Sequence, residues 1–172
     1  EEFDFDTDEQ CKELVRLTEK WNGFDEGRIK IDAGIYAEYT SNYKLWEGLV
    51  GYASEQGLGL QLHLAQTPGE VEGCLDRTGM NPGELLNCHG LFNVPVTAAG
   101  CGYLEPVEQK ILGRKKVTAV ALPLSAAKSG MDCAHILDCV QAGMNVALGT
   151  DGAVEAANLD MFEVMRGAAL AE

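Results

Sequence analysis

The chain has 172 residues, of which 46% are hydrophobic, and this length and composition suit one domain with a substantial core. Its 27 acidic and 13 basic residues give a formal net charge of -14, which disfavours nucleic acid and anionic membrane surfaces as partners because both are negatively charged. The sequence contains no apolar run long enough to span a bilayer and does not open with a basic and apolar leader, so we expect a cytoplasmic protein.

The first nine residues are dominated by Asp and Glu. We expect residues 1–9 to be a loosely ordered, solvated segment at the start of a single domain that spans residues 1–172. The six cysteines show no paired spacing, and several lie among apolar residues. They are therefore expected to be reduced thiols.

Helical and extended patterns alternate along the rest of the chain. The expected helices are 11–21, a helix that has Ser41 as its N-cap and ends at Gly57, 69–77 with Thr67 as its N-cap, 82–88, 105–112 and 132–142. The expected strands are 29–33, 58–64, 95–99, 117–122 and 145–149. Five strands that alternate with helices through short turns predict an α/β protein with a parallel sheet.

The last expected strand leads to a carboxylate. The apolar residues 146–148 are followed by Gly149, Thr150 and Asp151, and a helical pattern then places Leu159, Phe162 and Met165 three residues apart. Strand-to-helix loops at this edge of α/β sheets carry the functional residues of many proteins. Asp-Gly is also a common turn pair, so Asp151 is either a site residue or the cap of a turn before Gly152.

Three motifs carry a family resemblance: His63-Leu-Ala-Gln-Thr67 followed by Glu70-Val71; Leu104 with Glu105 and Glu108; and Val146-Ala-Leu-Gly-Thr-Asp-Gly152 followed by Asn158-Leu-Asp-Met-Phe162. In order, spacing and placement at strand ends, they resemble the amidohydrolase superfamily over residues 20–172. The most similar branch contains adenosine-type, methylthioadenosine and guanine-type deaminases together with chlorohydrolases.

The resemblance implies a fold. The family forms a metal-dependent (β/α)8 barrel, and this chain matches its fourth to eighth strands with their helices. We therefore expect a partial (β/α)8 TIM-type barrel with a parallel sheet, without the family's first three strands and its small β-sandwich. The resemblance leaves open whether this is part of a longer protein or a diverged half-barrel that stands alone.

The resemblance also implies a site. His63 and Asp151 occupy positions of metal ligands, so a divalent metal, Zn or Fe, would be the cofactor if a site forms. A metal with an open position lowers the pKa of bound water to about 7, and an aspartate beside it can accept the proton, which makes Asp151 the candidate catalytic residue. Gln66, Tyr36 and Ser125 occupy positions that imply contact with a substrate.

Several positions depart from the family pattern. The His-x-His pair of the first strand occurs nowhere in the chain, and Gly100 stands where the family has its next histidine. Tyr36 replaces a substrate-contacting histidine, and Gln66 replaces a glutamate. The His-Asn-Pro-x-Ser-Asn signature reads Ala121-Leu-Pro-Leu-Ser-Ala126, which retains only the proline and Ser125. Open zinc sites normally use three protein ligands, so the site is expected to be incomplete.

Three interpretations remain open. The first is an amidohydrolase-like barrel segment whose own catalysis is impaired or lost. The second is an active metal-dependent hydrolase of cyclic amidines, such as aminopurines, aminopyrimidines or triazines, that acts on a small molecule with ligands supplied from outside this chain. The third is a non-catalytic binding or oligomerisation module, because the open edges of a partial parallel sheet can pair with another chain. The expected partner is thus a second copy in a homo-oligomer or the remainder of a longer chain.

Overall fold

A five-stranded parallel sheet forms the centre of the molecule, as a computed structural model describes it for residues 3–156 and 158–171. The strands are β1 (Ala33–Gly34), β2 (Leu60–Leu64), β3 (Val96–Gly100), β4 (Thr118–Ala121) and β5 (Asn145–Leu148). They lie in sequence order, and each pairs in parallel with the next. The predicted α/β class and the parallel sheet are confirmed.

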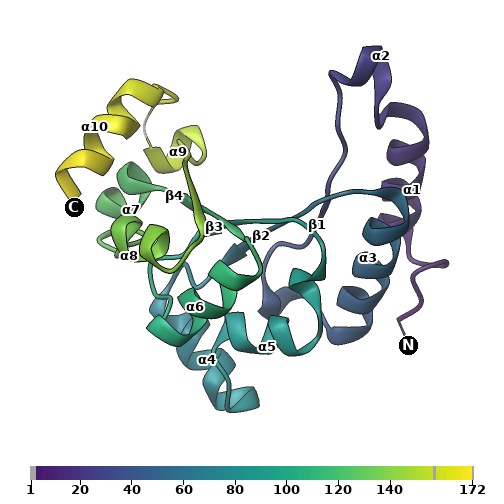
Figure 1. Ribbon diagram of the computed structural model, residues 1–172, viewed down its shortest axis with the longest axis horizontal. Helices are drawn as coiled ribbons and strands as arrows, with labels where there is room; N and C mark the ends of the chain where they lie inside the picture. Colours follow the sequence, from purple (N-terminus) through teal and green to yellow (C-terminus); the bar gives the residue numbers. More distant parts are fainter. Residues whose placement is uncertain (1–2, 157, 172) are drawn as a thin grey trace.

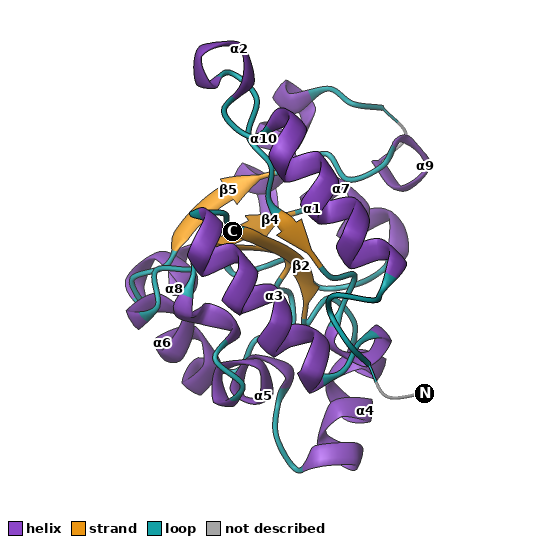
Figure 2. Ribbon diagram, turned by 90° about the vertical axis from the view of Figure 1, so that its right-hand side faces the viewer, coloured by secondary structure: helices purple, strands orange, loops and turns teal. Residues whose placement is uncertain are grey.

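The helices that connect the strands pack against one face of the sheet (Figures 1 and 2). The longer helices of the molecule are α1 (Glu9–Trp21), α3 (Tyr43–Gln56), α4 (Pro68–Thr78), α6 (Pro106–Arg114) and α10 (Met161–Ala171). The shorter ones are α2 (Phe24–Gly27), α5 (Pro82–Cys88), α7 (Pro123–Ser129), α8 (Ile136–Gln141) and α9 (Ala153–Ala156), together with the 3-10 turns η1 (Glu38–Thr40) and η2 (Leu91–Asn93). The N-terminal helices lie at one end of the sheet and α10 lies at the other (Figure 1).

Alternation along the strands decides which side chains face the helices. Leu60, Leu62 and Leu64 of β2 are buried, while Gln61 and His63 between them are more exposed. Successive side chains of a strand point to opposite faces, so the leucines face the helices and the other two face the opposite, concave side. One row of that side is polar, because Gln61 pairs with Thr97, Thr97 with Thr118 and Thr118 with Asn145.

Three of the helices begin with the same local chemistry. In α4, α5 and α6 a proline occupies the first turn, and a glutamate stands three residues after the N-cap. Proline has no N–H to leave unpaired at this position, and the carboxylate accepts otherwise unpaired backbone N–H groups. The predicted N-cap Thr67 is confirmed: its hydroxyl oxygen accepts the N–H of Glu70 at 3.1 Å.

Several predicted bounds were wrong for identifiable reasons. The strand expected at 29–33 is limited to Ala33–Gly34, because regular pairing with β2 begins only at Ala33. Asn42, rather than Ser41, caps α3: its side chain accepts the N–H groups of Lys44 and Leu45, both at 3.1 Å. The Ser41 hydroxyl instead accepts the indole N–H of Trp46 at 2.7 Å.

The region after β4 differs most from the prediction. Pro123 does end the strand, but it also starts α7, which the sequence analysis did not anticipate. The helix expected at 132–142 begins only at Ile136. The backbone N–H of Asp132 donates to the hydroxyl oxygen of Tyr103 at 3.0 Å, an interaction that holds this residue outside the helix.

The first described residues of the chain contact α3 and α1. Among residues 3–9, Phe5 packs on α3, where its ring centroid lies 5.6 Å from that of Tyr52, and Asp8 caps α1 through the N–H groups of Gln10 and Cys11. The six cysteines all lie among the described residues, and none of them forms a disulfide bond. In the part of the chain that the structure describes, no helix is long and apolar enough to cross a membrane.

Candidate functional site

The backbone is strained where several strands end. Ala65 follows β2 with a φ of 45°, Cys101 follows β3 with a φ of 59°, and Asp151 follows β5 with a φ of 60°. Side chains other than glycine rarely adopt this left-handed conformation, and such residues cluster at functional sites because the surrounding structure has to hold them there. The carboxyl edge of the sheet is therefore the candidate site.

His63 is held at this edge by Tyr36, which lies two residues after β1. The carbonyl oxygen of Tyr36 accepts the backbone N–H of His63 at 2.8 Å and lies 3.1 Å from its Nδ1. Because a carbonyl can only accept, this contact requires the proton on Nδ1 and leaves the lone pair on Nε2. The two rings also meet, with centroids 4.8 Å apart. In a neutral His63 this arrangement leaves Nε2 as the ring nitrogen that can accept a hydrogen bond or bind a metal.

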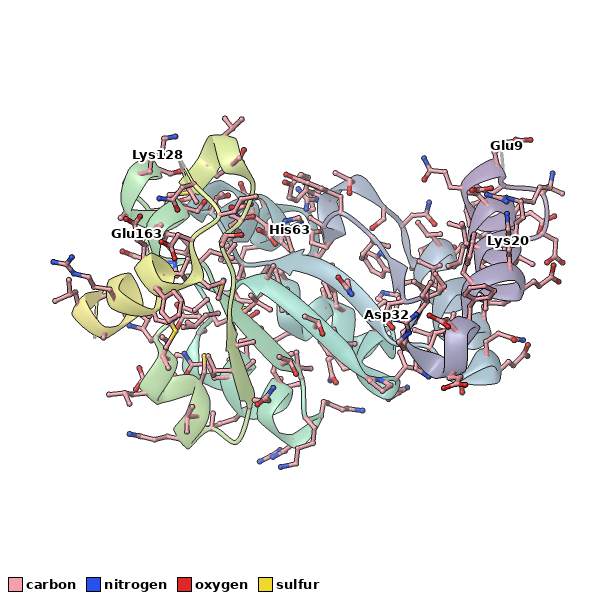
Figure 3. The ribbon with its side chains drawn as sticks, turned by 90° about the horizontal axis from the view of Figure 1, so that it is seen from above. Glu9, Lys20, Asp32, His63, Lys128 and Glu163 are labelled. Atoms are coloured by element: carbon pink, nitrogen blue, oxygen red, sulfur yellow. The ribbon has the colours of Figure 1, made fainter. Side chains whose placement is uncertain are left out.

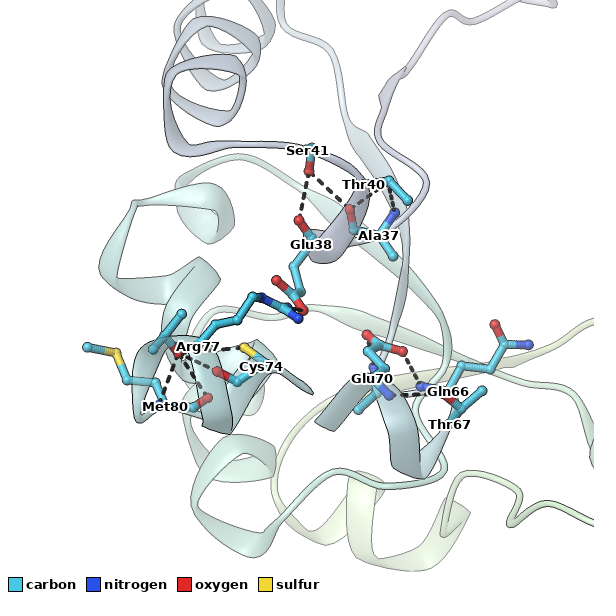
Figure 4. A network of polar contacts seen from close by, with 12 residues as sticks. Ala37, Glu38, Thr40, Ser41, Gln66, Thr67, Glu70, Cys74, Arg77 and Met80 are labelled. Atoms are coloured by element: carbon cyan, nitrogen blue, oxygen red, sulfur yellow. Dashed lines mark hydrogen bonds and ion pairs between the residues drawn. The ribbon is translucent and has the colours of Figure 1, made fainter. Parts of the chain in front are cut away.

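Glu70 fixes the turn that carries Gln66. Its two carboxylate oxygens accept the N–H of Ala65 at 2.8 Å and the N–H of Gln66 at 2.9 Å (Figure 4). Burial raises the pKa of this carboxyl above its usual value, although the two backbone donors act in the opposite direction. The sequence marked Glu70 as a helix-start residue, but nothing in the pattern indicated that its carboxylate would be buried under the site.

Gln66 fills the space beside Gly100. A Cβ atom added at Gly100 would lie 2.8 Å from the Cβ of Gln66 and 3.2 Å from its Cα, and Gly100 has a φ of 97°. Real Cβ contacts are almost never that short, and this φ is unfavourable for any residue with a side chain. The position that would carry a histidine in the resembling family therefore has no room for a side chain.

Ser125 and Asp151 form a pair across two strand ends. The buried hydroxyl of Ser125, in the first turn of α7, donates to Oδ2 of Asp151 at 2.7 Å. Oδ1 of Asp151 accepts the backbone N–H of Gly152 at 2.8 Å. A cavity of about 30 Å³ lies next to the pair, and its lining includes Gln66, Gly100 and Ser125. That volume holds about one water molecule.

The predicted site residues thus fall into two groups, Tyr36 with His63 and Gln66 with Ser125 and Asp151. Within the described ranges, no hydrogen bond joins the two groups. No three His, Cys, Asp or Glu side chains of these ranges converge as a metal site. His63 and Asp151 are suitable donors for a divalent metal, which would supply hydroxide at neutral pH. As a pair they fall short of the three protein ligands that an open site uses, so the residues of this chain alone do not fit a catalytic metal.

Replacing Ser125 with alanine is expected to lower the free energy of unfolding by about 1.5 kcal/mol, because a charge-assisted hydrogen bond to Asp151 is lost. Urea denaturation of the purified variant measures this change. Ser129→Ala is the matched control, since Ser129 lines the same cavity but is exposed, and its effect should stay within about 0.5 kcal/mol. Equal losses in both variants would contradict the assignment.

Comparisons with known proteins agree with this geometry. The amidohydrolase family model matches residues 3–172. The 5-methylthioadenosine/S-adenosylhomocysteine deaminase of Caldanaerobacter subterraneus subsp. tengcongensis is 36% identical over 162 residues, which cover 94% of this chain and 37% of that protein. The protein of the same name from Moorella thermoacetica is 40% identical over 156 residues, which cover 91% of this chain and 36% of that protein. The chain therefore spans little more than a third of the length of these relatives.

Solved structures show the same fold. An adenosine deaminase from Xanthomonas campestris with bound zinc superposes with a TM-score of 0.87 at 26% identity, covering 93% of this chain and 36% of that chain. An atrazine chlorohydrolase from Arthrobacter aurescens complexed with zinc gives a TM-score of 0.86 at 21% identity, covering 93% and 35%, and so supports the fold alone. The five parallel strands with their helices correspond to part of the barrel of these structures, and the chain belongs to the amidohydrolase family.

Proposed function

We propose that this chain is a deaminase-like amidohydrolase barrel segment that has lost hydrolytic activity of its own and acts as a non-catalytic module. The arrangement of Gln66 over Gly100 is the observation that carries the proposal. Loss of one histidine by simple substitution would leave an empty space at the carboxyl edge. In this chain the backbone conformation of Gly100 and the packing of Gln66 leave no space for a side chain, so the position cannot carry one without a rearrangement.

The neighbouring positions support the same function. Asp151 uses both carboxylate oxygens in hydrogen bonds within the protein, to Ser125 and to the N–H of Gly152. The adjacent cavity has room for about one water molecule. A fold can persist without its chemistry, because activity resides in the site and the scaffold is stabilised independently of it.

A second candidate function is favoured by one observation, the anchoring of His63 by Tyr36. Donation of the Nδ1 proton to a backbone carbonyl is the usual support of a metal-binding histidine. This candidate is a metal-dependent hydrolase of cyclic amidines, such as the methylthioadenosine and S-adenosylhomocysteine named for its relatives. Its missing ligands would come from polypeptide outside these residues.

The metal content of the purified chain separates the two candidates. We expect elemental analysis after incubation with zinc, with the protein mass determined in parallel, to give far less than one metal ion per chain. We also expect no release of ammonia from aminopurines or of chloride from chlorotriazines. The Caldanaerobacter relative, treated identically, is the positive control for loading and for the assays.

The opposite result would support the hydrolase. One zinc per chain that disappears in Asp151→Ala and in His63→Ala would show that a usable site has assembled. The Asn158→Ala variant is the control for substitution near the same edge, because Asn158 bonds to Glu163 and to the backbone of Asp160 instead of to the site. If Asn158→Ala retains zinc while Asp151→Ala and His63→Ala both lose it, the non-catalytic proposal is overturned.

A further inference from the structure

The chain between β1 and α3 forms a compact turn, residues 36–41, that we call the β1–α3 segment. The Ala37 carbonyl accepts the hydroxyl groups of Thr40 and Ser41, both at 3.0 Å, and the backbone N–H of Ala37 donates to the Thr40 hydroxyl at 3.3 Å. Ala37 itself is fully buried. These bonds make the segment one unit, so whatever fixes its position also fixes the carbonyl of Tyr36 at its start.

An ion pair ties this segment to α4. Glu38 is only 4% exposed, and a carboxylate that is buried without a partner is costly. Nη2 of Arg77, in the last turn of α4, donates to Oε1 of Glu38 at 2.5 Å (Figure 4). Arg77 is half exposed and lies 39 positions further along the chain. The pair therefore joins the segment after β1 to the helix after β2.

Both ends of α4 hold backbone that lies close to His63. In its first turn, Glu70 accepts two backbone N–H groups of the turn after β2. In its last turn, Arg77 holds the β1–α3 segment. A helix is a regular rod that rises about 1.5 Å per residue, so α4 keeps these two attachments at a set distance. It thereby sets the distance between the end of β2, which carries His63, and the Tyr36 carbonyl.

Arg77 also balances the charge of two buried acids. Burial raises the pKa of Glu70, and the nearby charge of Glu38 raises it further. The guanidinium of Arg77 offsets this repulsion because it pairs with Glu38. Without that cation, the buried carboxylate of Glu38 would be stabilised by turning toward water, and the β1–α3 segment would move with it.

The surroundings of His63 come from this chain's own elements. β2 pairs with β1 on one side and with β3 on the other. Figure 3 shows His63 between the two ends of the molecule, with Glu163 toward one end and Lys20 toward the other. The contacts that orient its ring are therefore formed within the described part of the chain.

We propose that Arg77 is a positioning residue for His63. Through Glu38 it holds the β1–α3 segment where the Tyr36 carbonyl meets Nδ1 of the imidazole, and so it keeps neutral His63 in the form that carries its proton on Nδ1. This role requires neither hydrolysis nor a bound metal, so it stands or falls independently of the function proposed above.

Long-range proton–nitrogen NMR spectra of the full chain labelled with ¹⁵N test the proposal. They are recorded with a chelator at about pH 8, where an ordinary histidine is neutral. The spectra distinguish the two imidazole tautomers, and the His63→Gln variant identifies the signals of His63. The wild-type chain should show the Nδ1–H form. In Arg77→Ala, the ratio of the Nδ1–H to the Nε2–H form should fall about threefold or more, because a neutral hydrogen bond contributes a factor of this size.

Two further variants separate positioning from general damage. Arg77→Lys keeps a cation beside Glu38 and should retain most of the wild-type ratio. Arg114→Ala is the matched control, because Arg114 occupies the last turn of α6, the helix that follows β3. It reproduces the loss of a cation from a helix C-terminus and should leave the ratio unchanged. The signals of the exposed His135 should stay constant in every variant.

Circular dichroism shows whether each variant is folded. If Arg77→Ala fails to fold because Glu38 is left unpaired, the double variant Glu38→Gln with Arg77→Ala removes that charge, and it should fold and show the same fall in the ratio. A folded Arg77→Ala or double variant with the wild-type ratio would overturn the proposal, because the β1–β2 pairing alone would then hold the Tyr36 carbonyl. An equal fall in Arg114→Ala, or a wild-type His63 with its proton on Nε2, would overturn it as well.

Discussion

Replacing Gly100 with alanine is expected to lower the free energy of unfolding by about 3 kcal/mol or more. Two effects add. The φ of 97° is costly for a residue that has a Cβ, and the new Cβ would meet the Cβ of Gln66 at 2.8 Å. Gln66 cannot simply move aside, because Glu70 holds its backbone N–H at 2.9 Å. Chemical denaturation at neutral pH measures the loss.

Gly51→Ala is the matched control for this experiment. Gly51 lies inside α3, and a Cβ atom added there meets nothing within 4 Å. Alanine in an unobstructed helix is more favourable than glycine by about 0.5–1 kcal/mol, so this variant should be more stable than the wild type. If Gly100→Ala were as stable as Gly51→Ala, the packing of Gln66 against Gly100 would be wrong, and with it the main support for a lost catalytic position.

The same geometry predicts that the lost histidine cannot be restored by a single change. Gly100→His should be at least as destabilised as Gly100→Ala, because the imidazole adds volume to the same filled space. Adding Gln66→Gly to the same molecule should recover part of the lost free energy of unfolding. If the double variant is more stable than the sum of the two single changes in unfolding free energy predicts, the two positions are coupled directly.

The sequence was sufficient for most of the architecture, because its signals are local. Prolines and glutamates at helix starts, together with apolar runs between turn residues, located all five strands to within a few residues, although only two residues of the first are paired. Pro123 shows the limit: the same residue ends a strand and is well suited to begin a helix, and the apolar pattern could not distinguish these roles. The three-residue spacing of Leu159, Phe162 and Met165 indicated a helix, yet these side chains are exposed and Val164 and Ala168 are buried. Apolar spacing predicts a helix, but which of its side chains are buried depends on the elements that pack against it.

The site was less predictable because its contacts join distant residues. Asp151 could be located at a strand end from the sequence, but its bond to Ser125 spans 26 positions. No pattern in the sequence indicates that Gln66 fills the space beside Gly100 or that the Tyr36 carbonyl holds His63. Each of these contacts depends on the parallel register of the sheet, which brings successive strand ends together without leaving a local pattern.

Glu108 joins the N-termini of two helices through a buried carboxylate. Its Oε2 accepts the N–H of Glu105, at the start of α6, at 2.9 Å, and its Oε1 reaches across to the N–H of Gly83 in α5 at 2.7 Å. The side chain is fully buried. Burial raises the pKa of Glu108 to about 7, because loss of solvent around the charge outweighs the two backbone donors. The folded chain therefore binds this proton more tightly than the unfolded chain, whose ordinary value is 4.5.

This difference predicts that stability falls as pH rises from about 4.5 to 7. In that window the folded state keeps the proton of Glu108 and the unfolded state has lost it, so each unfolding event releases a proton and is favoured by higher pH. The contribution to the free energy of unfolding is on the order of 3 kcal/mol across the window, and it is constant above pH 7. Glu108→Gln should remove this part of the slope, because an amide mimics the protonated carboxyl and does not titrate. Glu84→Gln, at the equivalent position of α5, controls for the loss of a negative charge from a helix N-terminus. Urea denaturation midpoints at half-unit pH steps measure the slope of stability against pH. If this slope is the same in the wild type and in Glu108→Gln, Glu108 is ionised throughout the window. Its two backbone donors would then outweigh its burial.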